Sequence, residues 1–290
     1  MTDELSTMWL ELVGHGVKEN YYDAGGVRTR ALEAGAGGAL ILLHGTGGHA
    51  ETYHRNLGRL GQRHHVYAID MLGHGFTDRP DVDYSMDDFT DHVIRFMDAA
   101  GIESAAISGE SLGAMVAAWA SVKHPERVSH AVLNTGILAR PDAKGLSELA
   151  DLETRTAALA ANLTRESVRQ RMEWLVLDPN DMTDELVECR YRIYSQPGML
   201  DSVQKIMSSV QRMIRGDWPV DYFAPSVLEG IKCPCLVLWT THNPGQSKEL
   251  AQSVMGDIPQ ATFQLLEDCA HWPQFESAEH FNRLHEDFLG

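Results

Sequence analysis

The stretch from Ser104 to Trp119 reads SAAISGESLGAMVAAW and decides the fold. Its first five residues are small and apolar, as expected of a buried strand, and its last six fit a helix. Between them, residues 109–113 have the G-x-S-x-G pattern of a serine on a sharp strand-to-helix turn, the nucleophile elbow. Glycines suit both ends of this turn, because side chains there would collide with the neighbouring strand and helix. A chance match or a glycine-flanked helix cap would give the same letters, so the surrounding chain has to distinguish them.

Strand-like and helix-like patterns alternate around this turn. Ser85 and Asp88 form a capping box that opens a helix with one apolar face. This alternation predicts an α/β fold with a doubly wound, mostly parallel, eight-stranded sheet and helices on both of its faces. The expected strands fall within residues 18–33 (two strands joined by a Gly-Gly turn), 39–43, 65–70, 104–108, 128–133, 235–239 and 262–266.

The alternation stops between residues 138 and 225, where only helical patterns occur. The clearest is an apolar stripe at helical spacing between residues 200 and 214. A final helix is expected at residues 278–289. We therefore expect a core α/β domain in two parts, residues 1–137 and 226–290, with a helical lid (residues 138–225) inserted between its sixth and seventh strands.

The composition narrows the classes of function. The formal net charge of −17 argues against nucleic acid, whose phosphates would be repelled without a basic face. Residues 1–5 show no basic n-region or apolar h-region, and no run reaches membrane-spanning length. Four cysteines are too few for a disulfide scaffold, which fits a reducing cytoplasm. We expect a cytoplasmic protein with a small-molecule partner and with no nucleic-acid or membrane partner, and a homo-oligomer is left open.

Reactive side chains follow several expected strands at their carboxyl ends, where open parallel sheets bind ligands. Ser111 is the candidate nucleophile. His271, after the last strand, is the candidate general base, because serine needs a neutral imidazole to take its proton. The backbone N–H groups of Thr46, in a Gly-rich loop, and of Leu112, at a helix start, are the candidate oxyanion hole.

A serine nucleophile and its histidine base are usually joined by an acidic residue that orients the histidine, which completes a catalytic triad. This sequence departs from that pattern. The residue expected to be acidic is Asn243, which can hold the imidazole tautomer but cannot stabilise an imidazolium by charge. Three hypotheses follow. Asn243 orients His271 in a reaction that tolerates weak base activation. Another carboxylate, such as Asp268 or one after the sixth strand, replaces it. Or the chain is a weakened or altered triad enzyme.

Other histidines at this sheet edge need separate interpretations. His44 and His74 are interpreted as groups that shape their loops, whereas His49 is a candidate substrate contact. No group of His, Cys, Asp and Glu residues has convincing metal-ligand spacing. We therefore expect neither a metal nor a cofactor.

Together these residues resemble the α/β-hydrolase superfamily over nearly the whole chain, including the order nucleophile, orienter, histidine. Residues 269–276 (CAHWPQFE) and 190–197 (RYRIYSQP) are similar to segments of meta-cleavage product hydrolases. Those enzymes cut a carbon–carbon bond in 2-hydroxy-6-oxo-hexa-2,4-dienoates, the ring-fission products of catechols. Glu110 and Asn243 depart from the family pattern, which often has Asn at the first position and has Asp at the second.

The resemblance implies a reaction and further site residues. Arg190 would bind near the carboxylate of an anionic dienoate, with Gly45 and Trp272 as further substrate contacts. After the dienol ketonises, Ser111 or a water activated by His271 would attack the C6 ketone. An esterase or lactonase on the same fold is the alternative, and a non-catalytic ligand-binding homologue is a further one.

Overall fold

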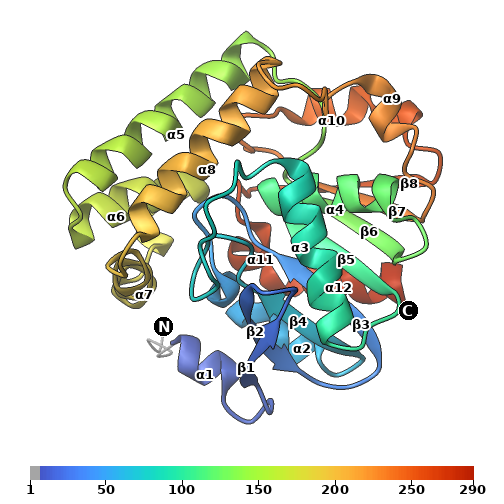
Figure 1. Cartoon of the computed structure of the whole chain (residues 1–290), viewed down its shortest axis with the longest axis horizontal. Helices are drawn as coiled ribbons and strands as arrows, with labels where there is room; N and C mark the ends of the chain where they lie inside the picture. The colour runs from blue at the N-terminus through green and yellow to red at the C-terminus, as the bar shows by residue number, and fades with distance from the viewer. Residues whose placement is uncertain (1–6) are drawn as a thin grey trace.

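The computed structural model describes residues 7–290 and contains one eight-stranded sheet in the order β1-β2-β4-β3-β5-β6-β7-β8. β2 is antiparallel to both β1 and β4, and all other neighbouring strands are parallel. Figure 1 shows the sheet among its covering helices, as predicted. The strands are β1 (Lys18–Asp23), β2 (Arg28–Ala34), β3 (Gly38–Leu43), β4 (His64–Ile69), β5 (Ala105–Glu110), β6 (Val128–Asn134), β7 (Cys235–Thr240) and β8 (Ala261–Leu266).

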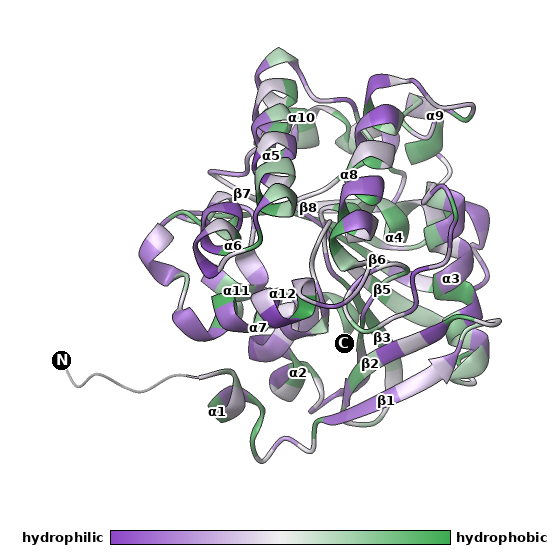
Figure 2. Cartoon of the chain, turned by 60° about the vertical axis from the view of Figure 1, so that its left-hand side comes forward, coloured by the Kyte–Doolittle hydropathy of each residue, from purple (hydrophilic) through white to green (hydrophobic). Residues whose placement is uncertain are grey.

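Apolar side chains cover both faces of the sheet. On one face, α3 (Met86–Ala99) and α4 (Leu112–Lys123) pack against the strands. On the other, α2 (His54–Leu60) and α12 (Ala278–Leu289) do so. The central strands are therefore buried on both sides, which explains their continuous apolar sequences. Figure 2 shows these strands as mostly hydrophobic, whereas the surrounding helices alternate between hydrophilic and hydrophobic bands.

A helical lid separates β6 from β7. Its apolar residues on α6 and α7 form a cluster with Trp272, which follows β8, so the lid packs on the end of the sheet that carries His271. α8 buries the predicted apolar stripe and lies beside α5 (Figure 1). The lid helices are α5 (Ala143–Ala161), α6 (Arg165–Met172), α7 (Asp184–Tyr194), α8 (Met199–Arg215) and α9 (Pro225–Leu228).

Shorter elements complete the fold. They are α1 (Met8–Leu12), α10 (Lys248–Ser253), α11 (Pro273–Glu276) and the 3₁₀ turns Ala50–Tyr53, Glu173–Leu175, Pro179–Asp181 and Met255–Asp257. Among the helices of residues 7–290, none combines the length and the hydropathy needed to cross a bilayer.

The local predictions are confirmed, but several strand boundaries shift by one or two residues; β4, for example, spans His64–Ile69 and not residues 65–70. The capping box is present, with the Asp88 N–H donating to Ser85 Oγ at 3.1 Å. The predicted end of the elbow strand at Ser108 is wrong, because Gly109 and Glu110 continue the parallel pairing with β6. The turn is therefore confined to Ser111. The numbered domain limits, 1–137, 138–225 and 226–290, stay a prediction.

Candidate active site

Ser111 lies on the sharp turn between β5 and α4. Its backbone has φ 55° and ψ −114°, a sparsely populated conformation for a residue with a side chain. A Cβ on Gly109 would collide with the carbonyl group of Gly113, and a Cβ on Gly113 would collide with that of Leu43. The expected need for both glycines is therefore confirmed. Ser111 lines a cavity at this edge of the sheet.

His271 follows β8 and is held by Asn243, which follows β7. The Nδ1–H of His271 donates to Asn243 Oδ1 at 2.6 Å, and Asn243 Nδ2 donates to the Gln246 carbonyl at 2.7 Å. The second bond sets the direction of the amide, so its oxygen faces the imidazole and keeps a proton on Nδ1. Trp174 packs against the imidazole with 4.9 Å between ring centroids. Asn243 thus occupies the place expected of the orienter, and its role in catalysis stays a prediction.

Glu110 lies on the opposite side of the imidazole. Its side chain is 2% exposed. Oε2 accepts the Gly45 N–H at 2.6 Å, and Oε1 lies 3.2 Å from His271 Nε2. Sequence analysis marked Glu110 as a departure from the family pattern but assigned it no role. This carboxylate also differs from the two replacements considered for the missing Asp, because it comes from β5 and not from a loop after β6 or β8.

Ser111 and His271 share the cavity without a direct hydrogen bond. Within residues 7–290, Ser111 Oγ makes no hydrogen bond to the imidazole, although both side chains line the same space. Catalytic hydrogen bonds are often long in the absence of substrate and shorten in the reacting complex. The predicted nucleophile and base are therefore neighbours, and their catalytic roles stay predictions.

Two backbone donors beside Ser111 are unengaged. Among the described residues, the N–H groups of Thr46 and Leu112 donate to no partner, and both residues line the cavity. Leu112 is the first residue of α4, so the positive end of the helix dipole adds to its N–H. The N–H of Gly45 is instead occupied by Glu110. Two free donors at this position are what the predicted oxyanion hole requires.

The cavity lies between the sheet edge and the lid. Its lining comes mainly from the loops at the carboxyl ends of the strands and from the lid helices α5 to α8. One part of its wall carries the polar groups described above. A largely apolar part comes from α5 and α8 and includes Leu149, Leu152, Met207, Val210 and Ile214. This division suits an organic molecule with a polar head and an apolar tail.

Arg190, on α7, is buried at the cavity without an acidic partner. Its side chain is 1% exposed, and within residues 7–290 its Nε and Nη2 have no hydrogen-bond partner. Its guanidinium carbon lies 5.2 Å from the centroid of the Trp272 ring. The predicted contacts Gly45, Arg190 and Trp272 all line the cavity, while their contact with substrate stays a prediction. A buried, unpaired cation is unfavourable in the free protein, so this position favours an anionic ligand.

Arg171, on α6, is a second buried arginine at the cavity, and sequence analysis missed it. Its Nε donates to Thr156 Oγ1 at 3.0 Å and its Nη2 to the Thr46 carbonyl at 3.3 Å, whereas Nη1 has no partner among the described residues. Burial, with Arg190 as a nearby like charge, lowers the pKa of Arg171 to about 10. It therefore stays charged at neutral pH. No sequence signal distinguishes it from the two exposed or half-exposed arginines of the same helix.

The other histidines of this sheet edge each hydrogen-bond to groups outside the cavity or to its loops, although His74 Nε2 has no partner among the described residues. His44 donates from Nδ1 to the Gly45 carbonyl at 2.8 Å and accepts the Met71 N–H at Nε2 at 3.1 Å, which agrees with a loop-shaping role. Burial lowers the pKa of His74 to about 4, so its ring is neutral at pH 7. His49 does not line the cavity, contrary to its candidate role as a substrate contact, because its ring turns toward Glu51.

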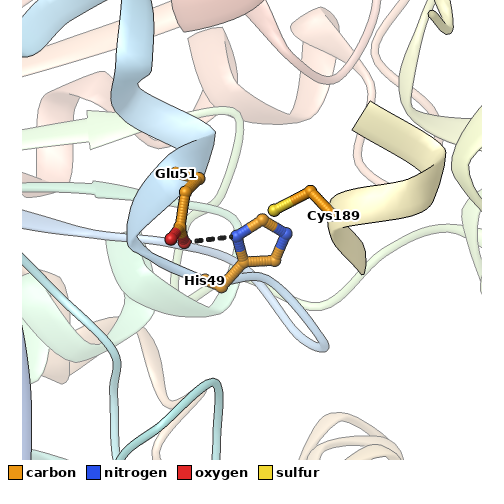
Figure 3. Close-up of side chains that lie close together, drawn as sticks. All are labelled: His49, Glu51 and Cys189. Carbon is orange, nitrogen blue, oxygen red and sulfur yellow. Dashed lines mark hydrogen bonds and ion pairs between the residues drawn. The ribbon is translucent and has the colours of Figure 1, made fainter. Parts of the chain in front are cut away.

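His49, Glu51 and Cys189 form a cluster that the sequence did not predict (Figure 3). Their potential ligand atoms lie within 4.8 Å of one another. However, Glu51 already accepts from both terminal nitrogens of Arg30, at 2.6 and 3.2 Å, and from His49 Nδ1 at 2.9 Å. Burial and the Glu51 charge raise the pKa of the Cys189 thiol to about 12, which disfavours the thiolate that a metal needs. The donor set therefore fits a hydrogen-bond network better than a metal site.

Known proteins share this architecture. A family model described as the alpha/beta hydrolase fold matches residues 38–278. The chain is 30% identical over 272 residues to a 2-hydroxymuconate semialdehyde hydrolase of Pseudomonas putida, covering 92% of each chain. It is also 30% identical over 267 residues to a 2-hydroxy-6-oxo-6-phenylhexa-2,4-dienoate hydrolase of Comamonas testosteroni, covering 89% of each.

A solved structure agrees with these relatives. The meta-cleavage product hydrolase from Pseudomonas fluorescens IP01 is 28% identical and superposes with a TM-score of 0.80, covering 97% of this chain and 98% of that one. The elbow at Ser111, the sheet order and the helical lid are thus found in a chain whose family is known. This protein belongs to the α/β-hydrolase fold family and is a hydrolase similar to the meta-cleavage product hydrolases.

Proposed function

We propose that this hydrolase cleaves a carbon–carbon bond in a 2-hydroxy-6-oxo-hexa-2,4-dienoate, a ring-fission product of aromatic degradation. The observation that carries the proposal is the buried, unpaired guanidinium of Arg190 in the same cavity as Ser111 and His271. A dienoate has a carboxylate at one end and a ketone along the chain, so an anion held at Arg190 leaves the ketone within the cavity. The names of the relatives support the same substrate class.

The groups in the cavity suffice for this reaction. After the dienol ketonises, Ser111 Oγ forms a bond to C6 and its proton passes to His271 Nε2. The oxyanion is held by the N–H groups of Thr46 and Leu112. Collapse breaks the C5–C6 bond, and C5 takes the electron pair and the proton from His271. Water then hydrolyses the acyl-serine to a carboxylic acid; direct attack on C6 by a water activated by His271 gives the same products.

Bleaching of a yellow dienoate tests this proposal. We expect rapid turnover by the purified protein. Arg190→Ala should lower kcat/KM about 10²-fold, mainly through KM, because charge-assisted hydrogen bonds to the carboxylate are lost. Arg192→Ala is the matched control, since Arg192 is exposed and paired with Glu188 at 2.7 Å. Unchanged kcat and KM in Arg190→Ala would show that the arginine assignment is wrong.

A p-nitrophenyl ester assayed in parallel distinguishes the other activities. Ester turnover much faster than dienoate turnover, with no effect of Arg190→Ala, would indicate an esterase or lactonase. No turnover of either compound, together with no labelling of Ser111 by an organophosphonate, would indicate a ligand-binding protein.

A further inference from the structure

The imidazole of His271 has a neutral amide at one nitrogen and a carboxylate at the other. Asn243 accepts from Nδ1, while Glu110 Oε1 lies 3.2 Å from Nε2. We propose that Glu110 is a positioning residue that supplies His271 with the negative charge that a Ser-His-Asp triad obtains from its third member. The proposal deepens the proposed function, on which it rests for its substrate but not for its test.

Asn243 cannot provide that charge. Its amide direction is set by the bond from Nδ2 to the Gln246 carbonyl, so only the neutral Oδ1 faces the imidazole. Such a contact fixes the tautomer and the ring orientation. It does not offset the positive charge that develops on the imidazole when the serine proton arrives, which an aspartate does in the Ser-His-Asp arrangement.

The surroundings of Glu110 hold its carboxylate close to Nε2 of His271. The side chain is 2% exposed, and the Gly45 N–H holds Oε2 at 2.6 Å, which leaves Oε1 directed at the imidazole. Arg171 lines the same cavity but makes no ion pair with Glu110 within residues 7–290. The carboxylate is therefore anchored by a backbone donor without being neutralised by a cation, and charges act strongly in such a water-poor site.

The proton transfer shows why this position matters. When Ser111 Oγ bonds to the substrate carbonyl carbon, its proton moves to His271 Nε2, and the carbonyl electron pair moves onto oxygen. The imidazolium then carries its new N–H beside Glu110 Oε1. A fixed carboxylate stabilises this charged state more than the neutral imidazole that precedes it, so its effect falls on kcat. The proton leaves again with the departing carbon.

A purely structural role is the competing explanation. Glu110 could serve only to hold the loop of Gly45 through its N–H. Glu110→Gln separates the two roles, because the amide oxygen can still accept that N–H while the charge is removed. Asn243→Asp then returns a carboxylate to the other nitrogen of the ring, far from Gly45 and without restoring the original contact.

A double-mutant cycle tests the proposal with wild type, Glu110→Gln, Asn243→Asp and the double variant. We expect Glu110→Gln to lower kcat about 10²–10⁴-fold with little change in KM, as for loss of the triad carboxylate elsewhere. Asn243→Asp should raise kcat at least about 30-fold in the Glu110→Gln background, and at least about ten times more there than in the wild-type background. Glu110→Asp, which keeps the charge, should retain more activity than Glu110→Gln.

Three outcomes would overturn the proposal: near-normal kcat in Glu110→Gln, the same effect of Asn243→Asp in both backgrounds, or a gain of about 100-fold from Asn243→Asp alone. The Asn243→Asp single variant leaves Glu110 unchanged. A gain of about 100-fold in that variant would therefore overturn the proposal even if Glu110→Gln fails to fold. The cycle is measured on the dienoate, on p-nitrophenyl acetate, and as the rate of Ser111 labelling by a fluorophosphonate. If the wild-type protein turns over the ester and is labelled but does not turn over the dienoate, the proposed substrate is wrong. If Ser111 of the wild-type protein is never labelled by the fluorophosphonate, Ser111 is not activated, and the proposed role of Glu110 is wrong as well.

Discussion

Two buried arginines of this protein have opposite surroundings. Arg30, on β2, is 5% exposed and contacts three carboxylates, Glu19 at 2.8 Å, Glu51 at 2.6 Å and Asp70 at 3.2 Å. Arg190, on the lid, is 1% exposed and has two nitrogens without a partner among the described residues. Their burial is the same and their pairing is not. The first charge is satisfied by the fold, whereas the second has two nitrogens left for the anionic ligand of the proposed function.

Other buried polar groups of this protein also differ in whether they have hydrogen-bond partners. His285 has both ring nitrogens engaged, since its Nε2 lies 2.8 Å from Ser108 Oγ and its Nδ1 donates to the Phe281 carbonyl at 2.9 Å. At the cavity, donors unpaired within residues 7–290 are found on the guanidinium groups of Arg171 and Arg190 and at the N–H groups of Thr46 and Leu112, while other unpaired polar atoms, such as His64 Nε2 and His92 Nδ1, lie outside it. Because unpaired buried charges cost stability, two arginines with unpaired nitrogens at one cavity favour a binding site there.

The largest expected effect separates chemistry from anion binding. Ser111→Ala should lower kcat at least about 10³-fold, as for removal of nucleophiles in other serine hydrolases. Binding of the dienoate, followed by its visible absorbance, should persist because Arg190 is unchanged. Wild-type turnover by Ser111→Ala would mean that water attacks C6 without help from the serine.

Stability measurements test the comparison of the two arginines directly. Arg30→Leu should reduce the free energy of unfolding by about 3–5 kcal/mol, because Glu51 and Asp70 are left buried without their cation. Arg190→Leu should be neutral or stabilising without ligand, since it removes a buried charge that has no acidic partner within residues 7–290. Urea unfolding of both variants provides the measurement. A loss of similar size in Arg190→Leu would show that its charge is compensated in the free protein.

The buried and fully hydrogen-bonded His285 predicts that the free energy of unfolding depends on pH. Burial lowers the pKa of His285 to about 4, against about 6.5 in an unfolded chain. Between these values the unfolded chain binds a proton that the folded protein does not, so the free energy of unfolding falls as the pH decreases from 6.5 toward 4. His285→Gln should remove up to about 3 kcal/mol of this decrease. Urea unfolding of both proteins at pH 7 and pH 5 measures it, and an unchanged slope would contradict the assignment.

The guanidinium of Arg171 has more hydrogen-bond partners than that of Arg190 but, unlike that of Arg30, no acidic partner within residues 7–290. We expect its replacement to have the smallest effect of the changes described. Two of its nitrogens are bonded and one has no partner among the described residues, and one bond holds the carbonyl of Thr46, whose N–H is a predicted oxyanion donor. Arg171→Gln should lower kcat/KM for the dienoate about tenfold, the value of roughly one hydrogen bond to a charged group. Arg165→Gln is the control on the same helix, because Arg165 is exposed and paired with Glu188 at 2.6 Å. Equal effects of the two changes would exclude a specific role for Arg171.

Much of the fold could be predicted because its signals are local. The apolar strands, the capping box at Ser85 and the glycines around Ser111 each depend on neighbours along the chain. The end of β5 could not be placed in this way, because pairing with β6 extends the strand through Glu110. Strand boundaries depend on a partner strand, and a partner strand is a non-local feature.

The candidate site was predicted as far as strand order allowed. Ser111, His271 and Asn243 follow three strands at one sheet edge, and the structure brings their side chains to one place. Glu110 and Arg171 received no role, since their significance depends on which atoms face them. The partner of Glu110 that holds it lies 65 positions away, at Gly45.

The sequence by itself determined where a serine, an imidazole and an amide can meet, because strand order and glycine geometry follow from short stretches of chain. Only the tertiary structure decided how the charges around them are balanced. Whether a buried charge is paired depends on side chains contributed by distant segments, and in this protein those segments are the lid and the loop after β3. The carboxylate facing His271 Nε2 and the unpaired guanidinium of Arg190 are both results of that packing.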